Sequence, residues 1–315
     1  MPIIQAPRAS AILYNLLKSQ DSPKPWLLPA NICPIVPITF FKAGVPFEFV
    51  DISAETLHMD LGKAEGRLKR GDYGGVLYAH TYGEPSTPVE FFQSVKSNFP
   101  DLLLVDDRCL CIPDLEPPQE IPADVMLFST GYAKIVELNF GGYAFLKAGT
   151  AYHPEPLPFD PQAHEEIKMD YKQAIQNRAQ YTYTDSDWLQ TDAGLPTWYD
   201  YRQQIENGLG TFMQQRAELN EIYVARLPAE IQLSSAYQIW RFNLRVKNKD
   251  HILEKIFSVG LFASSHYASL AGIMAPGQCP QAENLASEII NLFYDHHFDP
   301  QQAEEVCILI LETME

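Results

Sequence analysis

The stretch that decides the fold is Leu127-Phe-Ser-Thr-Gly-Tyr-Ala-Lys-Ile-Val-Glu-Leu-Asn-Phe-Gly-Gly-Tyr-Ala-Phe-Leu146. Apolar, β-rich segments at 125–128 and 143–146 predict two buried strands. Between them lie Ser129, Lys134 and a Gly-Gly pair. Burying an ammonium is costly, so burial lowers the pKa of a lysine, and a neutral amine is a nucleophile suited to Schiff-base chemistry. The alternative is a lysine at a loop tip that simply reaches water.

Composition excludes several classes of function. The chain has 315 residues, is 46% hydrophobic and carries a net charge of −17. Such acidity argues against binding of nucleic acid or an anionic membrane, but it allows an anionic small substrate. The start lacks the pattern of a signal peptide, and no apolar run approaches the roughly 20 residues of a membrane span. We expect a soluble, cytoplasmic protein.

The five cysteines are odd in number and scattered along the chain. This usage fits a reducing cytosol better than a framework of disulfides. Cys109 and Cys111 have the wrong spacing for a zinc knuckle. We therefore expect no metal site.

Upstream of Lys134, apolar strands alternate with helices. Helices are expected over 9–18, 35–42, 54–69 and 88–98, and strands within 26–34, 47–52, 75–82 and 102–105. This alternation predicts an α/β fold with a mainly parallel central sheet covered by helices. Ligands gather at the C-terminal strand ends of such sheets. His80, Tyr82, Asp107 and Ser129 all fall at those ends.

The rest of the chain predicts an excursion followed by a smaller C-terminal α/β domain. Residues 150–200 are rich in proline, tyrosine and aspartate around one expected helix, 163–180. A long helix is expected over 199–227. Strands 237–246 and 261–264 and helices 251–259, 280–292 and 301–314 follow. We place a large domain at 1–200 and a small one at 201–315.

A lysine, a carboxylate, a serine and a helix start match the needs of one cofactor, pyridoxal 5'-phosphate (PLP). Lys134 would hold its aldehyde as a Schiff base, and Asp107 would keep its pyridine nitrogen protonated. Ser129 and the helix start at Ser10 and Ala11 would hold its phosphate, since helix N-termini bind anions. Each signal is weak alone, and the prediction rests on their occurring together at strand ends in the right order.

At these residues the sequence resembles the DegT–StrS family of PLP-dependent sugar aminotransferases, as a short and divergent member. The matching positions are Ser129, Lys134, Gly141 and Gly142 in the lysine motif, Asp106-Asp107 in the acidic pair, His80-Thr81-Tyr82-Gly83, and His266-Tyr267. The resemblance implies the type I fold of aspartate aminotransferase and a homodimer. It implies transfer of an amino group from an amino acid, such as glutamate, to a keto sugar attached to a nucleotide. His80, Tyr82, His266 and Tyr267 are candidates for the substrate side, with ordinary packing as the alternative.

The sequence also departs from the family pattern. Leu110 replaces the usual glutamine, Cys33 replaces a ring-stacking aromatic residue, and Arg8-Ala9-Ser10 replaces the Gly-Thr phosphate turn. These departures leave a second hypothesis open, namely a non-catalytic or regulatory binding protein with the same fold. A nicotinamide dehydrogenase is disfavoured, because no Gly-x-Gly-x-x-Gly follows a strand.

Overall fold

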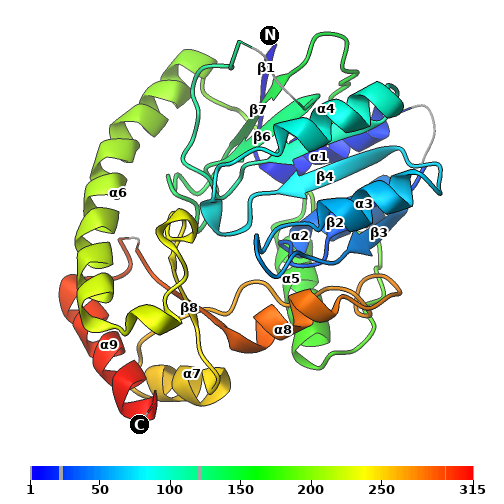
Figure 1. Ribbon diagram of the computed structural model, residues 1–315. Helices are drawn as coiled ribbons and strands as arrows, with labels where there is room; N and C mark the ends of the chain where they lie inside the picture. Colours follow the sequence, from blue (N-terminus) through cyan, green and yellow to red (C-terminus); the bar gives the residue numbers. More distant parts are fainter. Residues whose placement is uncertain (1, 21–23, 120–122, 295, 315) are drawn as a thin grey trace.

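A mainly parallel sheet forms the centre of the computed structural model, which describes residues 2–20, 24–119, 123–294 and 296–314. Its strands are Ile3–Ala6 (β1), Trp26–Pro29 (β2), Phe47–Val50 (β3), Gly75–Ala79 (β4), Leu103–Asp107 (β5), Val125–Ser129 (β6) and Gly142–Leu146 (β7). Their order is β1-β7-β6-β5-β4-β2-β3 (Figure 1). β7 runs antiparallel to its two neighbours, β6 and β1, and the other neighbouring pairs among these described strands are parallel. The predicted fold class is confirmed.

Helices cover both faces of this sheet. They are Ala9–Lys18 (α1), Ile35–Ala43 (α2), Leu61–Leu68 (α3) and Val89–Asn98 (α4). α1 and α2 pack together on one face, and α3 and α4 lie over the other, as right-handed crossovers require when the strand order reverses after β3 (Figure 1). The expected helix 54–69 begins only at Leu61, because the Asp60 side chain caps it by accepting the Lys63 amide at 2.9 Å.

The C-terminal half adds Pro161–Gln176 (α5), Trp198–Arg226 (α6), Phe242–Arg245 (β8), Lys249–Ser258 (α7), Pro280–Glu288 (α8), Ile289–Leu292 (β9) and Pro300–Met314 (α9). β8 and β9 form an antiparallel pair. The expected helix 280–292 was wrong at its end, because Ile289–Leu292 is fully buried and pairs with β8 as a strand. Segment 261–264 forms only an isolated bridge, Ser264 to Asn291, and the strand within 237–246 is limited to β8.

Two hydrophobic cores result. The larger one surrounds the seven-stranded sheet and also takes in Trp240 and the apolar side chains of 267–289. The smaller one joins α6, α7 and α9 to the β8–β9 pair. The long helix α6 runs along one side of the molecule and links the two cores (Figure 1). The division of the chain at residue 200 stays a prediction. No helix within the described residues is both long and apolar enough to cross a membrane.

Candidate functional site

A cavity of about 290 Å³ opens where β5 and β6 end and α1 and α2 begin. Asp107 and Ser129 contribute to its wall from the sheet, Lys134 from the loop between β6 and β7, and Ser10 from the first turn of α1. A smaller recess of about 30 Å³ adjoins it. The two spaces share Cys33, Asp107, Cys109 and Lys134 in their walls. The structure thus brings together four of the residues that the sequence singled out.

The loop that carries Lys134 is fixed through its backbone. The Arg216 guanidinium, on α6, donates to the carbonyl oxygens of Lys134 and Ile135 at 3.3 Å each. The indole of Trp240 donates to the carbonyl oxygen of Ala133 at 2.8 Å. Because these bonds use main-chain atoms, they leave the side chain of Lys134 to face the cavity. Arg216 and Trp240 are buried, so the loop is held by rigid groups.

Adjacent aspartates at the end of β5 have different environments, as alternation along a strand requires. Asp106 is fully buried, and its carboxylate accepts from His80 Nε2 at 2.6 Å and from Arg108 Nε at 3.0 Å. Burial acts to raise the pKa of Asp106, but His80 and Arg108 outweigh it and hold that pKa below its usual range. Asp107 lines the cavity instead, and its carboxylate accepts the Cys109 amide at 3.0 Å. Only Asp107 is therefore placed to act on a ligand.

Arg8, His164 and Lys168 line part of the cavity, which we call the cationic wall because Arg8 and Lys168 carry positive charge. Arg8 precedes α1, while His164 and Lys168 project from α5. Arg8 Nε and His164 Nε2 are both buried and have no hydrogen-bond partner within the described residues. Burial lowers the pKa of Arg8. The Arg8 Nε–H group is thus an unpaired buried donor beside the first turn of a helix, and an anion would satisfy it.

Two thiols lie where the cavity adjoins the recess. Cys33 and Cys109 line both spaces. Burial raises the pKa of each thiol, for Cys109 well above its usual value. Both thiols therefore stay protonated at neutral pH. A protonated thiol is a poor nucleophile, so neither cysteine competes with the Lys134 amine.

A glycine pair lets β7 approach α1. A Cβ atom at Gly142 would collide with the backbone of Ala9, and Gly141 has a φ of +91°. Side chains at these positions would push β7 away from the helix start, or strain its backbone. The Gly-Gly motif therefore serves close packing behind the cavity.

The titration of His164 is expected to make the stability of the protein depend on pH. Burial, with the charges of Arg8 and Lys168, lowers its pKa from 6.5 to about 4. The unfolded chain then takes up this proton first as pH falls, so the free energy of unfolding decreases below about pH 6.5 until about pH 4. Between about pH 7.5 and 5.5 we expect His164 to account for a loss of about 1 kcal/mol.

Urea unfolding of the ligand-free protein at both pH values measures this loss. In His164→Gln the decrease should be smaller by that amount. The exposed His251, on α7, gives the matched control His251→Gln, which should keep the wild-type pH dependence. An identical decrease in His164→Gln and wild type would contradict the assignment.

Comparison with known proteins identifies the fold. No protein-family model and no curated protein sequence matches the chain. Solved structures match it over nearly its whole length. A DegT DnrJ EryC1 StrS aminotransferase from Brucella abortus has a TM-score of 0.69 at 14% identity, covering 100% of this chain and 86% of that one. The chain has the fold of this aminotransferase family.

Other solved structures agree. A sugar aminotransferase from Streptococcus pneumoniae, in its PMP form, has a TM-score of 0.71 at 15% identity, covering 99% of this chain and 88% of that one. An aminotransferase involved in the biosynthesis of pseudoaminic acid, from Helicobacter pylori, has a TM-score of 0.68 at 14% identity, covering 100% and 87%. The resemblance drawn from the sequence is confirmed at the level of the fold.

Of the remaining candidate residues in this aminotransferase fold, two line the recess. Tyr267 lines the recess and stacks on Trp240 with ring centroids 6.1 Å apart. His80 also borders the recess, but both of its ring nitrogens are engaged, with Asp106 and with the Glu84 carbonyl oxygen. It therefore packs in place rather than reaching toward a ligand.

The other three are outside the residues that form the walls of the two spaces. Tyr82 is fully buried, with a hydroxyl that has no hydrogen-bond partner within the described residues. Burial, helped by Arg241 and Lys134, lowers the pKa of His266 to about 3, so its ring is neutral. Ala11 is fully buried and its amide donates to the Arg8 carbonyl oxygen at 3.0 Å. Within the aminotransferase fold, Ser10 rather than Ala11 meets the cavity.

Sequence reasoning missed the cationic wall and the groups that hold the lysine loop. One available signal was the i, i+4 spacing of His164 and Lys168, which places both on one face of the expected helix. No local signal marks Arg216 or Trp240, which lie about 80 and 100 residues beyond the loop that they hold.

Proposed function

We propose that the protein is a PLP-dependent aminotransferase that moves an amino group from an amino acid to a keto sugar. The observation that carries this proposal is one cavity whose lining contains the Lys134 amine, the Asp107 carboxylate and the cationic wall. A ligand with an aldehyde, a basic ring nitrogen and a phosphate needs these partners. The sugar aminotransferases among the solved structures with this fold support the same conclusion.

The residues present fit this cofactor. Arg8 Nε is a buried donor that a phosphate would satisfy. Ser10 and Ser129 add hydroxyl groups to the same cavity. Positive groups dominate its wall, where Arg8, Lys134 and Lys168 outnumber the single Asp107 carboxylate, although the whole chain is strongly acidic. This local inversion of charge favours an anionic ligand.

Each residue then has a distinct task. When bound, PLP supplies an electron sink for the charge that develops on the Cα atom of the amino acid. Lys134 Nζ would hold the aldehyde carbon and, when free, would move the proton from that Cα atom as general acid and base. The Asp107 carboxylate would stabilise a protonated ring nitrogen. Cys33 and Cys109 offer a neutral surface beside these groups.

We extend the proposal to the substrates and the assembly. Glutamate is the proposed amino donor, a nucleotide-linked keto sugar the acceptor, and the cytoplasm the location. A homodimer is supported by the exposed aromatic side chain of Tyr132, which borders the cavity and is 71% exposed in the single chain. Sedimentation should give twice the mass of one chain, and a mass of one chain would contradict shared sites.

The decisive experiment is reconstitution with PLP. A visible absorption band should appear, and borohydride followed by peptide mapping should locate the cofactor on Lys134. Glutamate should then bleach the band. A protein that takes up the cofactor on Lys134 but does not react with any amino donor would support the binding or regulatory alternative. That alternative is favoured by the apolar Leu110 and Cys33 in the recess wall. A protein that takes up no cofactor would overturn the proposal.

Loss of the Arg8 guanidinium should weaken binding of the cofactor through its phosphate. Arg8→Ala is expected to lower the affinity for PLP by about 10- to 100-fold, since hydrogen bonds to charged groups contribute roughly 1.5–3 kcal/mol. Equilibrium titration followed by absorbance measures the change. Pyridoxal, which has no phosphate, should bind wild type and variant alike. Lys172→Ala, on the exposed part of α5, is the matched control.

Equal losses for PLP and pyridoxal would place the effect of Arg8 elsewhere than at the phosphate. An unchanged affinity for PLP would remove Arg8 from the site altogether.

A further inference from the structure

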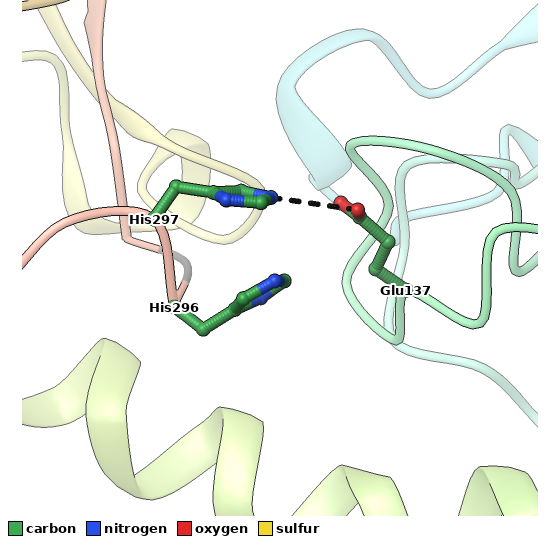
Figure 2. A group of neighbouring side chains, drawn as sticks. All are labelled: Glu137, His296 and His297. Atoms are coloured by element: carbon green, nitrogen blue, oxygen red, sulfur yellow. Dashed lines mark ion pairs between the residues drawn. The ribbon is translucent and has the colours of Figure 1, made fainter.

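Near Lys134, but outside the residues that line the cavity, a carboxylate of the same loop faces two adjacent imidazoles (Figure 2). They belong to Glu137, His296 and His297. The Glu137 side chain is 3% exposed, whereas that of His297 is 48% exposed. One ligand atom from each of the three residues lies within 4.8 Å of the other two. The three residues come from distant parts of the sequence and converge on one point.

We propose that Glu137, His296 and His297 form a binding site for a divalent transition metal ion, with Zn²⁺ as the preferred ion. Imidazole nitrogens and a carboxylate oxygen are ligands that Zn²⁺ accepts, at about 2.0–2.2 Å each. In a tetrahedral site these bond lengths separate neighbouring ligand atoms by roughly 3.3 Å. His297 Nε2 and Glu137 Oε1 are already 3.5 Å apart.

The two imidazoles are arranged to act together. Their ring centroids are 3.9 Å apart, and both rings extend toward the Glu137 carboxylate (Figure 2). They lie on an exposed turn before α9, where their side chains can reorient to close the remaining distance. Three protein ligands leave a fourth position for water, so the ion would be exchangeable. The negative charge of the buried Glu137 carboxylate would attract the cation, which two surface histidines alone would bind more weakly.

Metal binding would act on the lysine loop through Glu137. The second carboxylate oxygen, Oε2, accepts the Ala133 amide at 2.7 Å, next to Lys134. An ion held by both histidines would therefore tie residues 133–137 to the segment that leads into α9. This coupling does not require a cofactor in the cavity. The site is therefore independent of the proposed aminotransferase activity.

The test is metal titration of tag-free, chelator-treated protein. Co²⁺ is the probe, because its visible bands report a site of low coordination number, and Zn²⁺ should displace it. Wild type should bind one equivalent. His296→Ala and His297→Ala should each weaken binding at least tenfold. His251→Ala removes another exposed histidine beside a glutamate, Glu254 at 3.7 Å, and should bind like wild type.

Two outcomes would overturn the site: no stoichiometric uptake by wild type, or unchanged uptake in both His296→Ala and His297→Ala. Hydrogen exchange tests the link to the loop. Zn²⁺ should slow exchange in peptides that cover 131–139 in wild type, and not in His297→Ala. Stoichiometric binding with no slowing in that loop would refute the coupling. The histidine variants carry the test, because the buried Glu137 also supports the fold of the loop.

Discussion

Replacing Lys134 with alanine is expected to lower the rate of amino-group transfer by about 10⁴-fold or more, since a positioned acid–base group alone contributes roughly 10² to 10⁴. The variant loses both the nucleophile and the proton carrier. Single-turnover absorbance with glutamate measures the loss. Borohydride should no longer fix PLP covalently to this position. The apparent affinity for PLP should fall less than the rate, because the cationic wall stays intact.

The Lys134→Ala protein should fold normally. The bonds that hold its loop use the carbonyl oxygens of Ala133, Lys134 and Ile135, which the substitution leaves in place. Thermal unfolding without cofactor should therefore match wild type within a few degrees. Lys172→Ala is the control for removal of a lysine near the site. A Lys134→Ala protein with more than a tenth of wild-type activity would show that another group moves the proton.

The sheet could be predicted because its strands are local, continuous apolar runs. Leu103–Val105 and Val125–Phe128 are buried on both faces, so nearly every residue in them is apolar and the pattern needs no tertiary information. The start of α1 at Ala9 was likewise visible from the helical spacing that follows it. The positions of Asp107, Ser129 and Lys134 at one edge then followed from the topology of parallel sheets.

Other features depend on contacts between distant segments. Ile289–Leu292 continues a helical pattern in the sequence, but pairing with β8 buries all four residues and overrides that preference. The cationic wall needs α5 to line the same cavity as the start of α1, which no local pattern encodes. The meeting of Glu137 with His296 and His297 joins parts of the chain about 160 residues apart. Long-range packing, rather than local propensity, decides each of these.

Adjacent aspartates should give opposite phenotypes. Asp106→Ala is expected to destabilise the protein by about 3–5 kcal/mol, because removing one partner of a buried ion pair leaves the others without compensation. Asp106 and His80 are both fully buried at their side chains, and Arg108 and Thr87 also donate to the same carboxylate. Asp107→Ala removes the carboxylate that accepts the Cys109 amide, and should cost about 1 kcal/mol.

Urea unfolding at neutral pH, with linear extrapolation, separates the two variants. Asp107→Ala should fold nearly as stably as wild type yet lose most amino-group transfer, since nothing would then stabilise a protonated ring nitrogen. Asp106→Asn keeps the side-chain volume but places an amide beside donors that need a carboxylate. Its free energy of unfolding should therefore lie between those of wild type and Asp106→Ala. Equal stability losses for the two alanine variants would mean that both carboxylates serve the fold. In that case the alternation along β5 would not separate a structural aspartate from a ligand-facing one.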